Sequence, residues 1–474
     1  MHRKVKKDIT LGEKQMKLWM FLKEHMLQHP LQIVCEKDAV MTYEELVVYA
    51  EILAKKLSGE KICAIYCKSE MAAAMALLGC IAAGVAAVPL SARYGELHRK
   101  KIMQICNPSC LITDIEGDIG VYHITDSKCD LKNEQPALIM WTSGTTGTPK
   151  GAMLSDKGII ANVQDICKYF EMNDYDTILI SRPLYHCAVL TGEFLTALVK
   201  GTKVVFCSEK FNPALLIELM KKEKITTFCS TPTLLNLLSQ FIRGEDKMHL
   251  KYIVVSGECM SENVARRIKK SFRNTKIYHV YGLTEAGPRV SYMPPECFNK
   301  APDRVGIPLK SVEVEVRDKN GNVLPKNSRG ILWVSGPNIM IGYYNATELS
   351  KQKLHNGWLC TGDIAEIDNN GWIKILGRSD DLIIHAGMNI YPQEIEAELK
   401  KDMRTKEVLA YGYNAKPYGT QIGLKISGAF KNKDDVRTLC AKCLPPFEMP
   451  SKIEIVEEIE KNAAGKIIRR IGHA

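Results

Sequence analysis

The strongest constraint on the fold is an alternation of strand-like and helix-like segments in the first 300 residues. Thr42 and Glu45 form a capping-box pattern ahead of the amphipathic run YEELVVYAEILAKKL, which ends at Gly59. Further along, PALLIELMKKE and ENVARRIKKSF have helical periodicity. Five intervening segments are predicted strands: 176–181, 203–207, 225–229, 251–256 and 276–281. Because parallel strands need a crossover connection, usually a helix, this order predicts α/β layers with largely parallel sheets.

One uncharged run raises the question of a membrane span. Residues 71–90, MAAAMALLGCIAAGVAAVPL, carry no charge and approach the length of a transmembrane helix. Half of the run is Ala or Gly, however, and Pro89 lies near its end. The run also continues the strand–helix–strand alternation, since KICAIYC precedes it. We therefore predict a buried helix followed by a strand, and no membrane span.

Beyond about residue 300 the pattern changes to short strands separated by Gly and Asn turns. VEVEVRD, GILWVSG and GWIKILG predict a small β-rich subdomain over about 303–377. A helix (392–401), two strands, a second helix (434–444) and a final strand then predict a separate α+β domain. We expect an N-terminal domain over 1–377, a short charged hinge at 378–381 and a mobile C-terminal lid domain over 382–474.

Charge and cysteine content narrow the functional classes. The 474-residue chain has a net charge of +10, and its Lys residues are scattered, which suits ATP or coenzyme A and predicts no nucleic-acid site. Its sixteen cysteines, several in apolar runs, are expected to be free thiols in a reducing cytoplasm. Cys440 and Cys443 form a lone CxxC, so no zinc site is expected. The N-terminus lacks the apolar core of a signal peptide.

The segment TSGTTGTPKG (142–151) carries the strongest chemical signal. It follows the apolar strand ALIMW and precedes a helix-like stretch. Glycines let the backbone approach phosphate oxygens, while hydroxyls, amide N–H groups and a lysine supply donors and positive charge. Pro149 stands where a Walker loop needs Gly, so this is a different phosphate loop. The predicted ATP-binding residues here are Thr142, Ser143, Gly144, Thr145, Thr146, Gly147 and Lys150.

This loop resembles the phosphate-binding signature of the adenylate-forming superfamily, which comprises acyl- and aryl-CoA ligases, peptide-synthetase adenylation domains and luciferases. Later segments resemble the superfamily's other motifs in the same order: SGE (256–258), YGLTE (281–285), TGD (361–363), GRSDD (377–381) and KNAAGK (461–466). The resemblance implies an adenine site, an α-phosphate and Mg²⁺ site, and a ribose site. The adenine site comprises Gly257, Glu258, Tyr281 and Gly282. The α-phosphate and Mg²⁺ site comprises Thr284 and Glu285, and the ribose site comprises Asp363 and Arg378.

The resemblance also places a catalytic lysine, Lys466, on the C-terminal domain. A carboxylate that attacks the α-phosphate brings two anions together, so a cation that bridges them lowers the barrier. Adenylation and thiol transfer need different surroundings, which a mobile domain supplies in turn. The resemblance implies that Asp380 is the pivot and that Gly387 lines the thiol tunnel. The loop departs from the family in beginning Glu460-Lys461 instead of Pro-Lys.

Tyr185 and His186 resemble the aromatic–His pair that lies beside the acyl group in acyl- and aryl-CoA ligases. No acidic residue follows them before Glu193, which disfavours an α-amino acid substrate. Arg289 either recognises a second carboxylate or, as we expect, is a surface residue. The remaining pocket candidates are small or apolar and favour a hydrophobic or aromatic acid: Cys187, Leu190, Thr191, Ala286 and Gly287.

The expected activity is ATP-dependent activation of a small carboxylic acid to an acyl-adenylate, with pyrophosphate release, followed by thioester formation. The chain ends eight residues after Lys466. No fused carrier domain is therefore expected, and the thiol is coenzyme A or, as an alternative, a free carrier protein. Two other readings stay open: a luciferase-like oxygenase and a catalytically silent nucleotide-binding protein. ATP, Mg²⁺ and coenzyme A are the expected ligands.

Overall fold

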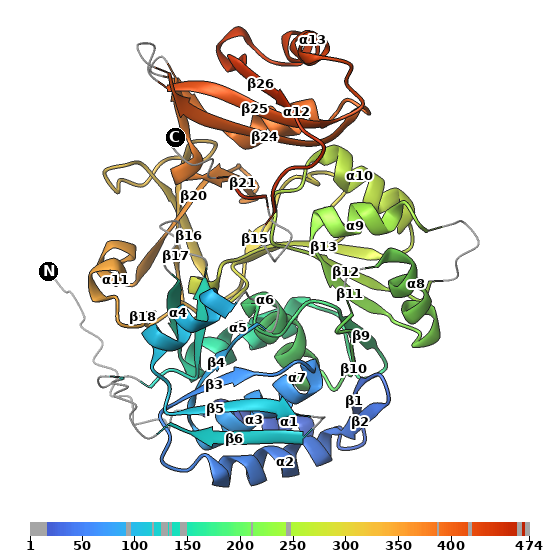
Figure 1. Cartoon of the computed structure of the whole chain (residues 1–474), viewed down its shortest axis with the longest axis vertical. Helices are drawn as coiled ribbons and strands as arrows, with labels where there is room; N and C mark the ends of the chain where they lie inside the picture. Colours follow the sequence, from blue (N-terminus) through green and yellow to red (C-terminus); the bar gives the residue numbers. More distant parts are fainter. Residues whose placement is uncertain are drawn as a thin grey trace, which may run out of the picture.

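The computed structural model describes residues 17–91, 96–115, 118–124, 131, 135–142, 149–209, 212–242, 248–385, 388–415, 420–461 and 467–469. These residues form two large sheets, a smaller five-stranded sheet and a C-terminal group of strands and helices. Figure 1 shows the N-terminal layers at the bottom and the C-terminal group at the top.

The first large sheet has nine strands in the order β15-β14-β13-β12-β11-β9-β10-β1-β2. All its neighbouring pairs from β1 to β13 are parallel, while β2, β14 and β15 pair antiparallel at the edges. The strands are β1 (Ile33–Glu36), β2 (Ala39–Thr42), β9 (Thr177–Ile180), β10 (Lys203–Phe206), β11 (Thr227–Ser230), β12 (Tyr252–Val255), β13 (Lys276–Tyr281), β14 (Ser291–Met293) and β15 (Ile307–Pro308). Three helices lie in its crossovers: α8 (Pro213–Lys222), α9 (Pro232–Ser239) and α10 (Glu262–Ser271). All five predicted parallel strands are therefore confirmed.

The second large sheet has seven strands in the order β18-β8-β7-β4-β3-β5-β6. The strands are β3 (Ile62–Tyr66), β4 (Ala86–Pro89), β5 (Cys110–Ile115), β6 (Asp118–His123), β7 (Leu138–Thr142), β8 (Lys150–Leu154) and β18 (Gly342–Tyr343). The helix α2 (Tyr43–Lys56) precedes β3, and the helices between the strands include α3 (Glu70–Ala83) and α4 (Glu96–Cys106). The capping box of α2 forms as predicted. The uncharged run is α3 followed by β4, and no helix of the described residues is long and apolar enough to cross a membrane.

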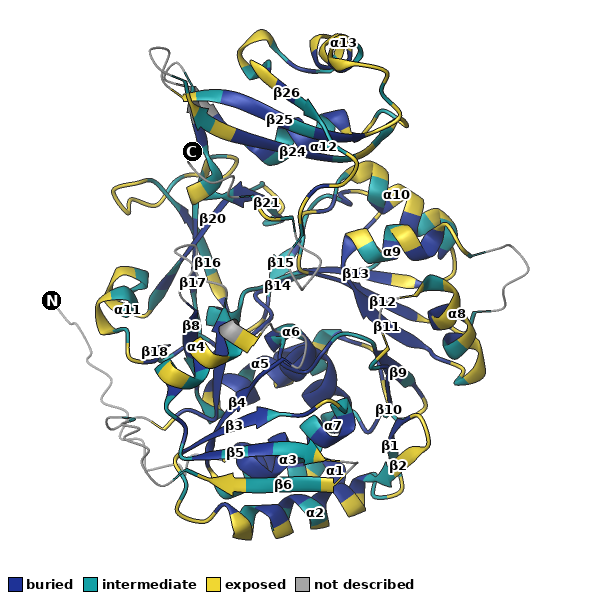
Figure 2. Ribbon diagram, viewed as in Figure 1, coloured by how far each residue is buried: buried dark blue, intermediate teal, exposed yellow. Residues whose placement is uncertain are grey.

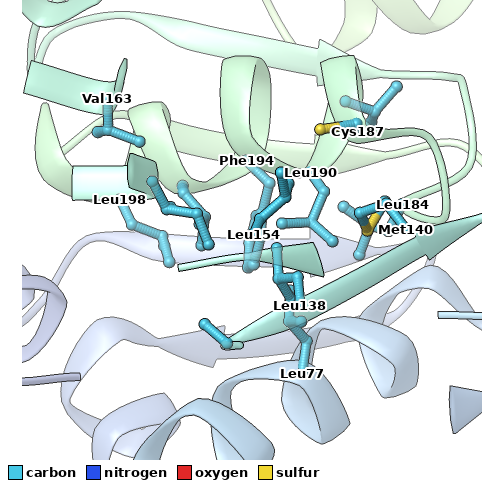
Figure 3. Packing of buried hydrophobic residues seen from close by; sticks show 14 of the residues in the cluster. Leu77, Leu138, Met140, Leu154, Val163, Leu184, Cys187, Leu190, Phe194 and Leu198 are labelled. Atoms are coloured by element: carbon cyan, nitrogen blue, oxygen red, sulfur yellow. The ribbon is translucent and has the colours of Figure 1, made fainter. Parts of the chain in front are cut away.

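The main core lies between these two sheets, where five helical segments are buried: α1 (Leu18–Met26), α5 (Asp156–Tyr169), α6 (Cys187–Val189), the π-helix η1 (Leu190–Leu195) and α7 (Thr196–Val199). Figure 3 shows Leu190 and Phe194 of η1 close to Leu138 and Leu154 of the seven-stranded sheet. Exposed residues gather on the outer faces of helices such as α2 and α10 (Figure 2). The core therefore holds η1 in a fixed position, and η1 carries two of the predicted pocket residues, Leu190 and Thr191.

The β-rich subdomain follows in sequence and forms the five-stranded sheet, with β21 paired to β20. Its elements are β16 (Glu313–Arg317), β17 (Arg329–Ser335), α11 (Thr347–Lys353), β19 (Leu354–His355), β20 (Trp358–Ile367) and β21 (Ile373–Arg378). Two short 3-10 helices, η2 (Thr284–Ala286) and η3 (Ser379–Asp381), contain residues of the predicted site.

The C-terminal group has its own hydrophobic core, which includes Ile395, Val408 and Leu424. Its elements are β22 (Ile383–His385), β23 (Met388–Ile390), α12 (Pro392–Leu399), β24 (Thr405–Asn414), β25 (Thr420–Gly428), α13 (Lys433–Cys443), η4 (Pro446–Glu448) and β26 (Lys452–Ile455). This order matches the predicted α+β pattern. The predicted fold class, α/β layers with a β-rich subdomain and a small C-terminal α+β domain, is confirmed.

Candidate active site

Three of the predicted nucleotide residues meet where the nine-stranded sheet approaches the five-stranded sheet. Asp363 of β20 pairs across the ladder with Arg378 of β21, and the Arg378 guanidinium donates to the carboxylate at 3.0 Å. The Tyr281 hydroxyl, at the end of β13, donates to the other carboxylate oxygen at 2.5 Å. Burial, the Asp363 charge and this hydrogen bond together raise the pKa of Tyr281 well above its usual range. The group thus contains a carboxylate acceptor and a guanidinium donor, which is the chemistry that the predicted ribose site requires.

The YGLTE segment turns sharply after β13, and its glycine is required by a close backbone approach. A Cβ on Gly282 would lie 1.7 Å from the Pro288 carbonyl oxygen. The turn carries Thr284 and Glu285 in η2, both half-buried. The Tyr343 hydroxyl donates to the Glu285 carboxylate at 2.7 Å, which orients this predicted Mg²⁺ ligand. The motif did not point to Tyr343, which lies 58 residues away on the edge strand β18.

Two buried asparagines, which the motifs did not identify, hydrogen-bond to the backbone of the segment that follows this turn. Asn338 donates to the Ala286 carbonyl at 2.6 Å, and Asn162 of α5 donates to the Arg289 carbonyl at 2.8 Å. They are 2% and 1% exposed, respectively. Gly287 between them has a positive φ of 32°. An asparagine inside an apolar run is the only sequence signal that marks them, and it does not indicate a partner.

The phosphate loop connects two paired strands. Thr142 at the end of β7 lies opposite Lys150 at the start of β8, and the Thr142 hydroxyl donates to the Lys150 carbonyl at 3.4 Å. The loop is thus followed by a strand, with α5 only after it, which corrects the predicted helix. The helix was predicted too early because KGAML carries no clear strand alternation. The predicted residues Ser143, Gly144, Thr145, Thr146 and Gly147 lie outside the described part of the chain.

The SGE segment follows β12. Gly257 has a positive φ of 93°, a backbone conformation that glycine adopts without steric cost. The Glu258 carboxylate accepts from the Thr233 hydroxyl at 2.6 Å, in the first turn of α9. In this arrangement Glu258 stabilises a helix N-terminus. Its predicted contact with adenine stays a prediction.

Most of the predicted acyl pocket residues lie on α6, η1 and the chain just before them, while Ala286 and Gly287 lie at the end of η2. The rings of Tyr185 and His186 lie 4.1 Å apart, with Tyr185 buried and His186 half-buried. Cys187, Leu190 and Thr191 are buried, and burial raises the pKa of the Cys187 thiol to about 12. Cys187 is therefore an uncharged packing residue at neutral pH. A π-helix is rare and is frequently found at functional sites.

A pocket opens on the side of this segment that faces the seven-stranded sheet. It is lined by Tyr185 and Leu190 together with residues of α3 and β3–β4, including Cys67 and Ser91. Glu70 in its wall accepts from the Leu184 N–H at 2.9 Å. None of the predicted ATP-binding residues that the structure describes lines this pocket. It adjoins the acyl side of the candidate site.

Arg289 is a buried residue, which corrects our expectation of a surface arginine. It is 2% exposed and ranks among the largest fully buried side chains. The local sequence did not indicate this burial, because Pro288 and Arg289 follow YGLTEAG with the composition of a polar turn. Glu193 of η1, also absent from the predicted site, is 1% exposed and pairs with Arg182.

The C-terminal residues with predicted roles are only partly described. Asp380 is exposed in η3, while Gly387 and Lys466 lie outside the described residues. Lys461 and Ile467 pair in an antiparallel bridge, and Lys461 also pairs with Glu407. Just beyond, Arg469 makes two 2.7 Å contacts with Glu396 of α12.

Glu285 is the candidate metal ligand at this site. Among the described residues, no group of three or more His, Cys, Asp or Glu side chains is placed to hold a metal ion. A Mg²⁺ site made of one carboxylate with phosphate oxygens and water fits that composition, because Mg²⁺ retains several waters and is commonly held by one or two carboxylates and the substrate phosphates.

Comparison with known proteins agrees with this geometry. Residues 22–130 and 120–344 match the model of the family described as AMP-binding enzyme. The chain is 27% identical over 438 residues to an oxalate–CoA ligase from Arabidopsis thaliana, covering 83% of this chain and 84% of that protein. It is 27% identical over 352 residues to a long-chain-fatty-acid–CoA ligase from Yersinia pestis, covering 72% of this chain but only 62% of the relative's length.

The fold is also that of a solved structure, ATP-bound MatB from Rhodopseudomonas palustris. The TM-score is 0.84 at 24% identity, with 95% of this chain and 97% of that chain covered. Three observations support the same family: the order of the motifs, the Tyr281–Asp363–Arg378 group, and the family match over most of the N-terminal 344 residues. The predicted superfamily is confirmed: the chain belongs to the family of AMP-binding enzymes.

Proposed function

We propose that this chain is an AMP-forming acid–thiol ligase, which activates a carboxylic acid with ATP and transfers the acyl group to coenzyme A. The observation that carries the proposal is the Tyr281–Asp363–Arg378 group beside the η2 turn that bears Thr284 and Glu285. The comparisons support the proposal, because relatives that match the chain are named CoA ligases.

In the first half-reaction, an oxygen of the acid attacks the α-phosphorus of ATP, and the bond from that phosphorus to the pyrophosphate oxygen breaks. Asp363 accepts from a ribose hydroxyl and Arg378 donates to the other, which fixes the α-phosphate relative to η2. Thr284 donates its hydroxyl to an α-phosphate oxygen. Lys466 neutralises the charge that accumulates between the two anions.

Glu285 would hold Mg²⁺, and the residues present suit that role, since an oriented carboxylate oxygen is a hard ligand. When bound, the ion supplies positive charge that stabilises the departing pyrophosphate. The Tyr343 hydroxyl keeps Glu285 pointed in one direction. In the second half-reaction, the thiol sulfur attacks the acyl carbonyl carbon, and the acyl–phosphate bond breaks to release AMP.

The acid is expected beside His186, against Tyr185 and the apolar wall formed by Leu190 and Ala286. These side chains favour an acyl group with apolar surface next to its reactive carboxyl. The named relatives act on acids as different as oxalate and long-chain fatty acids, so they do not select one. The described cysteines are free thiols, which supports a location in the reducing cytoplasm.

The test is pyrophosphate release from ATP and Mg²⁺ with panels of aryl, fatty, dicarboxylic and amino acids. We expect release with one class of acid, loss of release in Lys466→Ala, and no change in Lys351→Ala, which removes an exposed lysine of α11. Adding coenzyme A should then yield thioester and AMP. ATP binding without release for any acid would favour a silent nucleotide-binding protein, and transfer only to an added carrier protein would replace coenzyme A as acceptor.

A further inference from the structure

The Arg289 guanidinium lies against the π-helix η1, which carries the predicted pocket residues Leu190 and Thr191. A Cβ built on Gly192 of η1 would lie 3.1 Å from Nη2 and 3.2 Å from Cζ of Arg289. The absence of a side chain at Gly192 therefore leaves the space that the guanidinium fills. Arg289 follows the Thr284–Ala286 turn by only three residues, so the same segment carries the phosphate-side groups and this buried cation.

The charges around Arg289 do not balance within the described chain. Arg182 pairs with Glu193, so one buried carboxylate already has its cation. Glu193 has one oxygen with no hydrogen-bond partner, and the Arg289 Nε also has none. Arg289 forms no salt bridge with the described residues, although its charge acts on the nearby Glu193 carboxylate. Two arginines therefore face one carboxylate in a buried site.

Burying a charge without a counter-ion is costly, because the charge loses its hydration and gains no ionic partner in return. Such an arrangement persists where a ligand supplies the missing charge, and the site next to it is one where acids bind. The Tyr169 hydroxyl contacts the guanidinium, but a neutral hydroxyl does not cancel its charge. The reactive carboxyl belongs at the α-phosphate end of the site, beside Thr284.

We propose that Arg289 binds a second carboxylate at the far end of the acid, so that the substrates of this chain are dicarboxylic acids. This inference rests on the proposed ligase function and narrows its substrate class. Arg289 is then the specificity-determining residue, and Gly192 gives it room. Arg182 already pairs with the adjacent Glu193 carboxylate, so that carboxylate does not neutralise Arg289 fully.

The experiment compares acids of equal chain length that differ only in the second carboxyl: glutarate with pentanoate, and adipate with hexanoate. Pyrophosphate release and calorimetric binding of each acid are measured in the full chain. The variants are Arg289→Met, which keeps the volume without the charge, and Gly192→Ala, whose methyl group displaces the guanidinium. Arg266→Met, on the exposed face of α10, is the matched control.

We expect wild type to prefer the dicarboxylate of each pair. Arg289→Met should lower kcat/KM for that acid by about 100-fold or more and change the monocarboxylate by less than about 3-fold, because a buried donor rejects the analogue that lacks its partner. Gly192→Ala should show the same selective loss to a smaller degree. Arg266→Met should behave as wild type.

Equal turnover of both acids by wild type, or an equal loss for both in Arg289→Met, would overturn the proposal. The equal loss would mean that Arg289 faces the reactive carboxyl or only supports the fold. If wild type releases no pyrophosphate with any acid, the ligase function fails, but calorimetry still decides this inference. Glutarate binding that depends on Arg289 supports it, and glutarate binding that is absent or independent of Arg289 contradicts it.

Discussion

Asp363 is the residue on which the nucleotide side of the site converges, since it accepts from both Tyr281 and Arg378. Asp363→Asn removes the charge but keeps the shape, so both charge-assisted hydrogen bonds weaken. Hydrogen bonds to charged groups contribute about 1.5–3 kcal/mol each, so we expect KM for ATP to rise by about 10- to 100-fold. Steady-state pyrophosphate release at varied ATP measures this.

Glu348→Gln is the control for that change, because it removes one exposed carboxylate of α11 that pairs only with Lys351. Its KM for ATP should equal that of wild type. A KM that stays constant in Asp363→Asn would mean that ribose does not lie at this position.

His279 predicts a loss of stability in acid. It is 1% exposed on β13, and burial lowers its pKa to about 4, against about 6.5 in the unfolded chain. Between those values the unfolded chain binds a proton that the folded chain excludes, so stability present above pH 6.5 is lost as the pH falls to 4. The free energy of unfolding should fall by up to about 3 kcal/mol from this group alone.

Melting temperature measured from pH 7 to 4 tests this with two variants. His279→Gln removes the titration, so its melting temperature should fall less with pH than that of wild type, even though it starts lower. His355→Gln, at an exposed histidine, should keep the wild-type slope. An unchanged slope in His279→Gln would assign the acid sensitivity to other groups.

Single residues show what the sequence was able to predict about the site and what it was not. Tyr281, Asp363 and Arg378 were predicted because each sits in a short motif, and the structure brings them together. Arg289 was misjudged, since its burial depends on Gly192 from a distant segment. Asn338 was missed for the same reason. Contacts made across the fold leave no local pattern around the residues that make them.

At the scale of elements, two serines offer the same chemical change in different structural settings. Ser155 caps α5, with its hydroxyl accepting from the Gly158 N–H at 3.1 Å. Ser261 occupies the equivalent position before α10, but its hydroxyl makes no cap and has no hydrogen-bond partner. Ser155→Ala should therefore lower the free energy of unfolding by about 1 kcal/mol, while Ser261→Ala should be close to neutral. Denaturant titration of both variants measures the contrast, and equal losses would contradict it.

Periodic elements were predictable because their pattern is local. The strands β9 to β13 and the helix α2 lie where alternation and the capping box placed them. The π-helix η1 was not predicted; its residues Leu190 and Phe194 are buried in the same core as Leu138 and Leu154 (Figure 3). The strand β8 was taken for the start of a helix, and its partner β7 is what makes it a strand.

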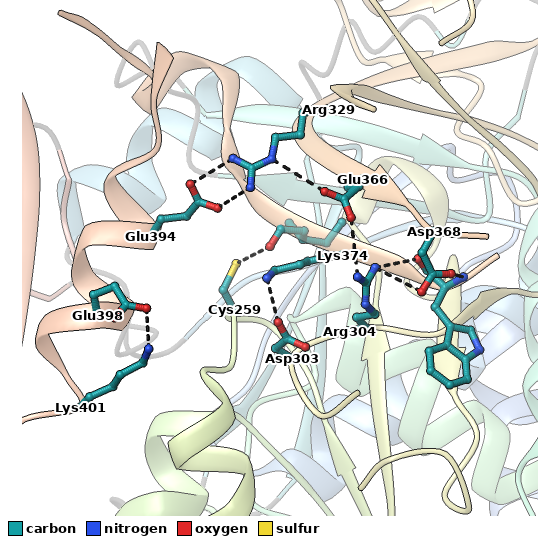
Figure 4. Close-up of polar contacts among 12 residues, drawn as sticks. Cys259, Asp303, Arg304, Arg329, Glu366, Asp368, Lys374, Glu394, Glu398 and Lys401 are labelled. Carbon is teal, nitrogen blue, oxygen red and sulfur yellow. Dashed lines mark hydrogen bonds and ion pairs between the residues drawn. The ribbon is translucent and has the colours of Figure 1, made fainter. Parts of the chain in front are cut away.

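At the scale of the whole molecule, the order of domains was readable from changes of pattern, but their placement was not. The C-terminal domain meets the β-rich subdomain through side chains on separate segments, and such pairs have no sequence signature. Arg329 of β17 contacts both oxygens of Glu394 on α12, at 3.0 and 3.1 Å, and it also lies 3.8 Å from Glu366 (Figure 4). If residues 378–381 are a hinge, this ion pair stabilises the present orientation of the C-terminal domain relative to orientations reached by rotation about the hinge.

Breaking the pair should therefore alter the balance of the two half-reactions rather than the chemistry of either. Arg329 is partly exposed, so the pair contributes at most about 1 kcal/mol, and Arg329→Gln or Glu394→Gln should change the ratio of adenylate formation to thioester formation by about 2- to 5-fold. The double variant should equal Arg329→Gln, which removes the Glu394 contact and also the contact of Arg329 with the Tyr391 ring. Arg404→Gln breaks pairs that lie wholly within the C-terminal domain, with Asp402 and Asp435, and should leave the ratio unchanged. Rapid-quench measurement of the two steps decides the matter: a ratio that stays constant in all variants would mean that the Arg329 contact does not influence domain rotation, and a loss of both steps alike would point to damage within a domain.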